Sequence, residues 1–182
     1  MTVILITGTP GTGKTSVSKI LSENLESSLV AVNDLVEKKH LYNGLDDEKG
    51  YKVVDLDALS KEIRKIIEDK MEGHVIVEGH LAHTFKNEEM VNLVIVLRAK
   101  PEILRKRLNK REWSSSKVQE NLEAEALDIC TFEAVEMYGK RVNELDTSDI
   151  GVEEVAELII EVLNGNKYFP PGNLNFLEDL YG

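Results

Sequence analysis

The chain has 182 residues, of which 42% are hydrophobic and 30% charged, and this size and balance predict one globular domain that buries its own core. A formal net charge of −11 argues against broad binding to nucleic acid, which depends on neutralising phosphates, and we expect no direct sequence-specific nucleic-acid contact. No apolar run at the N-terminus approaches the length of a membrane span, so we expect a cytoplasmic protein without a membrane partner.

Short apolar runs alternate with helical patterns along most of the chain. The run Thr2–Thr7 is rich in β-branched residues, and an amphipathic pattern over Ser16–Leu25 follows it, which predicts a buried parallel strand and then a helix. Further strands are expected at Ser28–Val32, His74–Val77, Leu93–Leu97 and Arg141–Leu145. The alternation predicts the α/β class, with a five-stranded parallel sheet covered by helices on both faces.

The helices between these strands have recognisable start signals. Asn33-Asp34 is expected to cap a helix over Leu35–His40, a loop is expected over Leu41–Tyr51, and Asp57 is expected to cap the next helix. Pro101 suits the first turn of a later helix. The remaining helices are expected from Ser114 or Ser116 towards Tyr138, and over Val152–Leu163.

The turn after the first strand is rich in glycine. Gly8-Thr9-Pro10-Gly11-Thr12-Gly13-Lys14-Thr15 matches the pattern G-x-x-x-x-G-K-[ST] at every fixed position and lies, as that pattern requires, between a strand and a helix. Its glycines allow a tight turn in which N–H groups converge on phosphate oxygens, and the helix N-terminus adds partial positive charge. Lys14 is expected to reach the β- and γ-phosphates of ATP, and the Thr15 hydroxyl to ligate Mg²⁺. The sequence therefore predicts a P-loop NTPase fold with an ATP site.

An acidic residue at the end of a neighbouring strand is the usual second partner of the magnesium ion. Glu78 ends the run His74-Val75-Ile76-Val77-Glu78 and is the candidate for this role. His80, two residues later, could orient an attacking water or a phosphate oxygen. The alternatives are a Glu78 carboxylate paired with a surface base and a loop histidine without a role.

A basic segment follows the fourth strand, and such a positive patch on an acidic protein suits a small polyanion. It consists of Arg98, Lys100, Arg105, Lys106, Arg107, Lys110 and Arg111. Arg107 and Arg111 are four residues apart on the helix that begins at Pro101, and arginine forks match phosphate geometry, so both are expected at the transferred phosphoryl group. The segment from about 110 to 120 would form a small lid that excludes water on closing, with a solvated charged helix as the alternative. The turn that begins at Asp146 is expected on the adenine side, because the chain lacks the guanine-binding pattern N-K-x-D after a strand.

Several groups of residues together resemble one known family. They are the glycine-rich loop, Asn33-Asp34-Leu35, Leu41-Tyr42-Asn43-Gly44, Glu78-Gly79-His80 and Leu108-Asn109-Lys110-Arg111-Glu112-Trp113. Through them the chain from about 2 to 163 is similar to adenylate kinase isoenzyme 6, the coilin-interacting nuclear ATPase family, which has archaeal members and belongs to the P-loop nucleoside monophosphate (NMP) kinases.

The resemblance implies a kinase domain, which we expect over 1–164, with an NMP-binding segment at about 30–53 and a lid at about 110–120. The resemblance does not cover residues 165–182, which we expect to form a C-terminal tail. It implies that Arg111 reaches ATP from the lid and that Glu78 and His80 stand at the Asp-x-His pair of the family. The residues that it implies around ATP are Gly11, Gly13, Lys14, Thr15 and Ser16.

The resemblance leaves the function open between two main hypotheses. It implies a broad-specificity adenylate kinase that phosphorylates AMP or a related NMP, and also ATPase activity with a role in small ribosomal subunit maturation. Glu78 stands where the family commonly has Asp, Glu37 where eukaryotic members often carry Arg, and Gly79-His80-Leu81-Ala82 where ordinary adenylate kinases have Gly-Phe-Pro-Arg. These departures weaken the AMP signature. The alternative is therefore an ATP-hydrolysing assembly factor that binds a ribosomal protein, with a small-metabolite kinase as a third reading.

Overall fold

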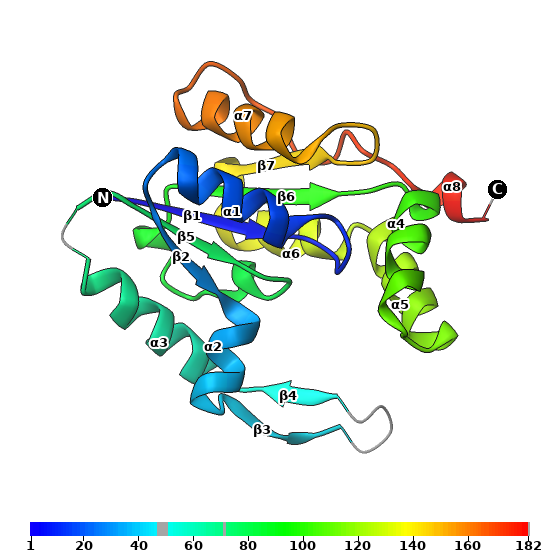
Figure 1. Cartoon of the computed structure of the whole chain (residues 1–182), viewed down its shortest axis with the longest axis horizontal. Helices are drawn as coiled ribbons and strands as arrows, with labels where there is room; N and C mark the ends of the chain where they lie inside the picture. The colour runs from blue at the N-terminus through cyan, green and yellow to red at the C-terminus, as the bar shows by residue number, and fades with distance from the viewer. Residues whose placement is uncertain (47–50, 71, 182) are drawn as a thin grey trace.

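The computed structural model describes residues 1–46, 51–70 and 72–181. Its centre is a five-stranded parallel sheet with the strand order β2-β5-β1-β6-β7 (Figure 1). The strands are β1 (Thr2–Thr7), β2 (Ser28–Ala31), β5 (His74–Glu78), β6 (Leu93–Arg98) and β7 (Val142–Asp146). This arrangement confirms the predicted fold class and the five predicted strands.

Helices cover both faces of the sheet. The helices α1 (Lys14–Asn24) and α7 (Val152–Leu163) pack against one face through a cluster that includes Ile4 and Ile6 of β1. The helices α2 (Val32–Lys39), α3 (Leu56–Glu68) and α6 (Ile129–Tyr138) pack against the opposite face, where Val3 and Leu5 point. Because successive strand residues point to opposite faces, burial on both sides explains why the central strands are apolar throughout.

The register of the sheet brings two functional segments together. Ile6 of β1 pairs with Glu78 of β5, so the carboxyl ends of these strands lie side by side. The glycine-rich loop leaves β1 here, and the Glu78–His80 segment leaves β5 next to it. In open parallel sheets this edge is the usual place for a ligand.

Two predicted helix starts were wrong. The helix α2 begins at Val32, with no side-chain cap, because Val32 is fully buried in the core and burial outweighs the capping preference of the two residues after it. For α3 the cap is Asp55 instead of Asp57, since the Asp55 carboxylate accepts a 2.9 Å hydrogen bond from the Ala58 N–H.

Two further segments differ from their predictions. The expected loop over 41–51 contains β3 (Tyr42–Leu45), which pairs antiparallel with β4 (Lys52–Val54); the strands are short and largely exposed, so no hydrophobic alternation marks them, and residues 47–50 lie outside the described part. The long helix expected after Ser114 is two helices, α5 (Ser115–Ala126) and α6, because Asp128 takes a left-handed conformation with φ of +56° between them.

Two small projections stand on either side of the ligand edge. One is the arm, formed by α2 and the β3–β4 hairpin. The other is the lid, formed by α4 (Pro101–Leu108), a 3₁₀ turn over Asn109–Arg111, and α5. The lid has an apolar cluster of its own, which includes Leu104, Leu108 and Leu122.

The tail runs from α7 along the outer side of β7 and ends beside the lid. The Phe169 N–H donates to the side-chain oxygen of Asn143 at 2.8 Å, and the Phe169 carbonyl accepts from the Glu144 N–H at 2.9 Å; both partners belong to β7. Its last helix, α8 (Leu177–Tyr181), contacts α4 and α5, and Phe176 just before it is buried. Within the described residues, no helix combines the length and the apolarity that a membrane crossing requires.

Candidate active site

The phosphate loop crosses from β1 to α1 in a conformation that its glycines make possible. Gly8 has φ of +134°, and a Cβ at this position would lie 2.2 Å from the carbonyl oxygen of Leu97. Gly13, with φ of +99°, directly precedes the first turn of the 11-residue helix α1. The Thr12 hydroxyl donates to the Thr9 carbonyl at 2.9 Å inside the loop. The loop therefore presents the N-terminus of α1, which favours anions, to the ligand edge of the sheet.

Lys14 is folded back onto this loop. Its Nζ donates to the carbonyl oxygens of Gly8 at 2.8 Å and Thr9 at 3.0 Å, and its side chain is buried. Burial lowers the pKa of Lys14 to about 8, while the nearby Glu78 carboxylate opposes the shift. A phosphate beside the ammonium group would favour its charged form. The position thus holds a buried ammonium group whose charge a bound anion would stabilise.

Thr15 and Glu78 form the metal side of the site. The Thr15 hydroxyl lies 3.4 Å from both oxygens of the Glu78 carboxylate, across the junction of α1 and β5. Burial raises the pKa of Glu78, which Lys14 and the Thr15 hydroxyl counteract. These are the hard oxygen ligands that Mg²⁺ prefers. In the described part of the chain no cluster of three or more His, Cys, Asp or Glu side chains forms a cage for a metal, so the two residues fit an ion that arrives with phosphate oxygens and water.

His80 stands two residues beyond Glu78 and lines the same cavity as the phosphate loop. Burial, together with the positive charge of Lys14, lowers the pKa of His80 to about 4. The imidazole is therefore neutral at physiological pH, so it has one nitrogen that accepts a hydrogen bond from water and another that donates one.

Three adjoining cavities follow the ligand edge of the sheet. The central cavity, of about 120 Å³, lies between the loop residues Pro10 to Ser16 and the side chains Asn33, Glu78, His80 and Arg111. A second cavity, of about 300 Å³, shares Gly11 and Arg111 with the first and extends towards α7. A third, of about 770 Å³, shares Thr15 and Glu78 with the first and extends along the edge strand β2. The predicted ATP residues Gly11, Gly13, Lys14, Thr15 and Ser16 all lie around the central cavity.

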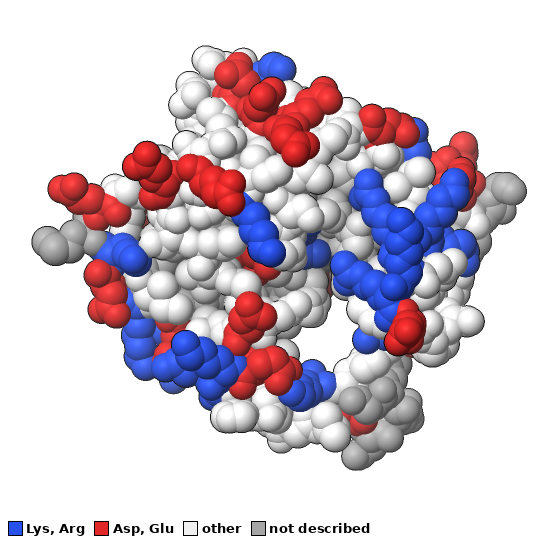
Figure 2. All heavy atoms as spheres, in the orientation of Figure 1, with Lys and Arg blue, Asp and Glu red and all other residues white. Residues whose placement is uncertain are grey.

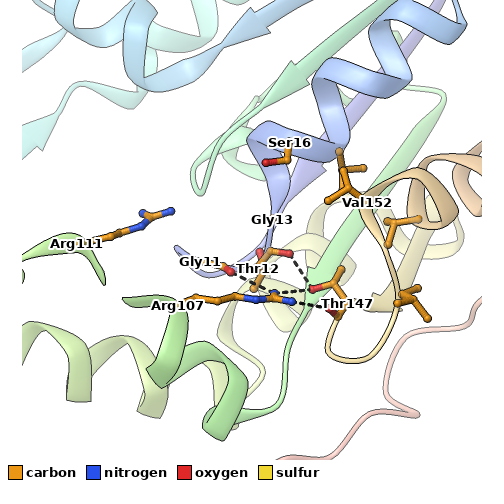
Figure 3. Close-up of a pocket in the computed structure, with 11 residues that line it drawn as sticks. Gly11, Thr12, Gly13, Ser16, Arg107, Arg111, Thr147 and Val152 are labelled. Carbon is orange, nitrogen blue, oxygen red and sulfur yellow. Dashed lines mark hydrogen bonds between the residues drawn. The ribbon is translucent and has the colours of Figure 1, made fainter. Parts of the chain in front are cut away.

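The two predicted arginines have different surroundings (Figure 3). Arg107 donates to the carbonyl oxygen of Thr147 at 2.8 Å, to its hydroxyl at 3.2 Å and to the Gly11 carbonyl at 3.3 Å. Arg107 lines only the second cavity, whereas Arg111 lines both the second and the central cavity. The expectation that one continuous helix carries both was wrong, because α4 ends at Leu108 and Arg111 belongs to the 3₁₀ turn that follows.

The turn after β7 contributes its second residue to the cavity. The Asp146 carboxylate accepts from the Ser148 N–H at 2.9 Å and from its hydroxyl at 2.5 Å, so it fixes the turn. Thr147 lines the cavity, and its hydroxyl lies 2.8 Å from the Thr12 carbonyl. The sequence predicted a nucleotide contact for Asp146 in this turn, whereas Thr147 is the residue of the turn that lines the cavity. No sequence pattern indicated that Arg107 links this turn to the phosphate loop.

Replacing Arg107 with lysine is expected to raise the KM for ATP about tenfold with a smaller change in kcat, because charged hydrogen bonds of this kind contribute about 1.5 kcal/mol or more to holding the cavity wall. Steady-state kinetics with varied ATP measure the change. Arg105→Lys, on the exposed side of the same helix, is the control and should match the wild type. An unchanged KM in Arg107→Lys would show that the wall does not contact the nucleotide.

His83, which sequence reasoning ranked below His80, is buried behind the central cavity. Its Nδ1 lies 2.6 Å from the Thr7 hydroxyl and its Nε2 lies 2.8 Å from the Glu133 carboxylate. Burial lowers the pKa of His83 below its ordinary value of 6.5, although Glu133 opposes this shift.

This shift predicts a loss of stability in acid. A histidine that stays neutral when folded but takes up a proton when unfolded leaves stability intact above its ordinary pKa of 6.5 and removes it as the pH falls below that value. In urea unfolding at pH 7 and pH 5, His83→Gln should therefore lose less stability between the two pH values than the wild type. Equal losses would show that the imidazole titrates normally in the folded chain.

Comparisons with known proteins agree with this geometry. A family model described as an AAA domain matches residues 4–128. A protein of Methanothermobacter thermautotrophicus named "Putative adenylate kinase" is 43% identical over 181 residues, which cover 99% of this chain and 100% of the relative. The chain belongs to this archaeal adenylate kinase family. A member from Archaeoglobus fulgidus with the same name is 40% identical and covers 98% of this chain and 93% of its own length.

Solved structures of other kinases resemble this chain in fold alone, because the sequence identities are low. Shikimate kinase from Acinetobacter baumannii in complex with shikimate superposes with a TM-score of 0.66, at 17% identity over 92% of this chain and 95% of the other. Shikimate kinase from Aquifex aeolicus gives a TM-score of 0.56 at 21% identity, over 90% and 97% of the two chains. Together with the P-loop and the family, the fold identifies this member as a kinase with a nucleotide site.

Proposed function

We propose that the protein is a broad-specificity adenylate kinase, which transfers the γ-phosphate of Mg-ATP to AMP or a related nucleoside monophosphate. The observation that carries the proposal is the central cavity, where phosphate-loop N–H groups, Lys14, Glu78 and Arg111 face one space. Transfer of a phosphoryl group needs positioning and charge neutralisation more than covalent chemistry, and these residues supply both.

Each residue has a definite task in this proposal. Lys14 leaves its loop carbonyls and binds the β- and γ-phosphates, which stabilise its positive charge. Mg²⁺, held by the Thr15 hydroxyl and the Glu78 carboxylate, would neutralise phosphate charge when bound. Arg111 reaches the transferring phosphoryl group from the lid, and Arg107 secures the wall of the cavity that takes the nucleoside of ATP.

The acceptor would enter between the arm and the lid. Figure 2 shows an opening between these two projections, with basic side chains gathered on its lid side. The basic residues of the lid are Arg105, Lys106, Arg107, Lys110, Arg111 and Lys117. The Lys117 ammonium of α5 lies 4.9 Å from the ring centre of Tyr51, next to the hairpin, so the two projections touch beyond the opening. A passage with a positive rim suits a monophosphate.

An assay of ATP consumption with and without AMP, CMP and dAMP tests the proposal. ADP formation is expected to rise far above the rate of ATP hydrolysis when an acceptor is added, with a second nucleoside diphosphate as the product. Turnover that stays at the hydrolysis rate with every acceptor would contradict a nucleotide kinase. A further panel of phosphate-accepting metabolites would then test the small-metabolite reading.

A second candidate is an ATP-hydrolysing factor in small ribosomal subunit maturation that acts in the cytoplasm on a ribosomal protein. The neutral His80 at the central cavity favours this second candidate, because such an imidazole is able to orient a water molecule towards the γ-phosphate. His80→Ala should then lower hydrolysis more than transfer to AMP. A pull-down with no ribosomal partner whose binding responds to nucleotide would count against this role. In either case, we propose residues 1–164 as the kinase domain, with 165–182 as a tail that supports the lid.

A further inference from the structure

Three side chains that are far apart in the sequence form a row of hydrogen bonds behind the central cavity. Thr7 ends β1, His83 lies in the short 3₁₀ turn Ala82–Thr84, and Glu133 is on α6. The Thr7 hydroxyl lies 2.6 Å from His83 Nδ1, and His83 Nε2 lies 2.8 Å from the Glu133 carboxylate. Thr7 and His83 are buried, whereas the Glu133 side chain is 52% exposed. This row of hydrogen bonds thus runs from the base of the active site to the protein surface.

The chemistry of the three groups fixes the direction of these bonds. An ionised carboxylate only accepts hydrogen bonds, so Glu133 requires the proton of a neutral His83 to be on Nε2. His83 Nδ1 is then an acceptor, and Thr7 donates its hydroxyl proton to it. Glu133 therefore selects one tautomer of His83, and that tautomer selects one orientation of the Thr7 hydroxyl.

The same three groups join the two halves of the catalytic centre. Thr7 directly precedes Gly8, the first residue of the phosphate loop, and His83 follows the Glu78–His80 segment by three residues. Backbone bonds support this contact, because the Gly79 N–H donates to the Ile6 carbonyl at 3.1 Å. The imidazole is consequently a side-chain link between the root of the phosphate loop and the turn that carries the proposed metal ligand. It acts beside a longer contact of 3.4 Å between the Thr7 hydroxyl and the His80 carbonyl.

We propose that His83 is a positioning residue of this active site, and that its imidazole, oriented by Glu133, sets the spacing between the phosphate loop and the Glu78–His80 turn. The inference rests on the proposed phosphoryl transfer. His83 is not a catalytic residue in this assignment, because it lines none of the three cavities. It acts on the reaction through Thr7 on one side and through the turn on the other.

Paired variants separate positioning from mere stability. Thr7→Val removes the hydroxyl and keeps the branched shape, while Thr7→Ser keeps the hydroxyl. Glu133→Ala removes the orienting carboxylate at a half-exposed site, where folding is little affected. Glu136→Ala, three residues further along α6 and also exposed, is its control. In the metal sites of enzymes, loss of such an orienting partner typically costs about 10- to 100-fold in activity.

The kinetic test is the kcat of the full chain with Mg-ATP, measured with and without a nucleoside monophosphate. Thr7→Val and Glu133→Ala are expected to lower kcat about tenfold with little change in the KM for ATP. Thr7→Ser and Glu136→Ala should stay close to the wild type. ATP hydrolysis without acceptor is measured in the same samples. If the wild type only hydrolyses ATP, the proposed transfer is wrong, and the effect of the variants on the hydrolysis rate still tests the role of His83.

A spectroscopic readout is independent of activity. In protein labelled with ¹⁵N-histidine, His83, assigned by the loss of its signals in His83→Gln, should show a protonated Nε2 and an unprotonated Nδ1. Glu133→Ala should mix the two tautomers, and Glu136→Ala should not. If the tautomer is already mixed in the wild type, or if Thr7→Val and Glu133→Ala keep the wild-type kcat, His83 is only a buried structural residue and the proposal is wrong.

Discussion

Replacing Lys14 with methionine is expected to lower kcat/KM for both phosphoryl transfer and ATP hydrolysis by about 10³-fold or more, because the phosphates lose a preorganised charged donor. The same variant should not lose stability. Since the pKa of Lys14 falls from 10.5 to about 8 on folding, its protonation costs free energy as the pH falls from 10.5 towards 8. At pH 7 this cost is fully present, and methionine removes it while keeping the length of the side chain.

Lys19→Met is the matched control on the same helix. Lys19 is exposed and lines the large cavity along β2, outside the central cavity. Its variant should keep both the catalytic rate and the urea midpoint of the wild type, whereas Lys14→Met should unfold at the same or a higher urea concentration. Transfer at the wild-type rate by Lys14→Met would contradict the assignment of the central cavity. A large loss of its stability would instead mean that the two bonds to loop carbonyls hold the loop together.

The parts of the site that could be predicted from the sequence are those with a local cause. The phosphate loop follows from one continuous motif, and Glu78 follows from its place at the end of an apolar run, because parallel strands end at the same edge of a sheet. The β3–β4 hairpin was missed because its residues are mostly exposed and carry no alternation of polar and apolar side chains. The start of α2 was missed because Val32 is held by tertiary packing, which no local signal reports.

The contacts made across the chain could not be predicted in this way. Arg107 reaches Thr147, 40 residues away, and His83 reaches Glu133, 50 residues away. Only the folded chain shows that Arg107 of the basic segment donates a hydrogen bond to the phosphate loop at Gly11, while Arg98 of the same segment is buried. Sequence reasoning assigned Arg98 to a basic patch that faces a polyanion. The structure corrects this assignment, because Arg98 is 1% exposed.

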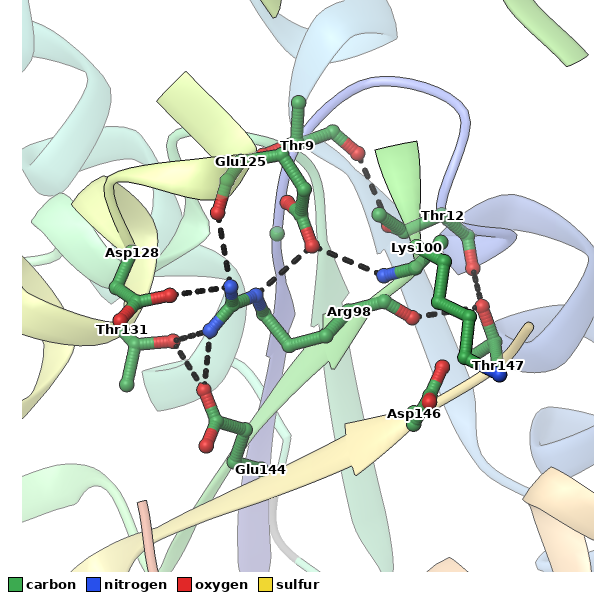
Figure 4. Close-up of polar contacts among 12 residues, drawn as sticks. Thr9, Thr12, Arg98, Lys100, Glu125, Asp128, Thr131, Glu144, Asp146 and Thr147 are labelled. Atoms are coloured by element: carbon green, nitrogen blue, oxygen red, sulfur yellow. Dashed lines mark hydrogen bonds and ion pairs between the residues drawn. The ribbon is translucent and has the colours of Figure 1, made fainter. Parts of the chain in front are cut away.

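Arg98 sits at the end of β6 in a network of carboxylates (Figure 4). Its Nε donates to Glu125 at 2.8 Å, and its two Nη groups donate to the carboxylates of Glu144 and Asp128, to the Thr131 hydroxyl at 3.2 Å and to the Glu125 carbonyl at 2.8 Å. All five guanidinium protons therefore have acceptors. A lysine has only three N–H donors and could not satisfy all of these acceptors. The ring of the tail residue Phe176 lies 5.2 Å from the guanidinium carbon.

This network holds together the elements that frame the nucleotide side of the site. Glu125 lies in the last turns of the lid helix α5 and also accepts from the Ala99 N–H at 2.9 Å. Glu144 belongs to β7 and accepts from the tail at Gly172, at 3.0 Å. The Arg98 carbonyl accepts from the Thr147 N–H at 2.8 Å, next to the cavity that Arg107 lines. Lid, tail and cavity wall are thus fixed to one buried cation.

Replacing Arg98 with methionine should destabilise the protein by about 3–5 kcal/mol, since removal of one member of a buried ion network leaves the remaining charges uncompensated. Glu125 and Glu144, each 1% exposed, would lose their counter-ion while keeping their burial. Urea unfolding measures the change, and Arg64→Met on α3 is the control, because its partner Glu68 is exposed and such pairs contribute about 1 kcal/mol or less. A small effect in Arg98→Met would mean that water enters the network and solvates its carboxylates. A large effect would mean that the lid and the tail depend on one guanidinium for their place beside the ATP site.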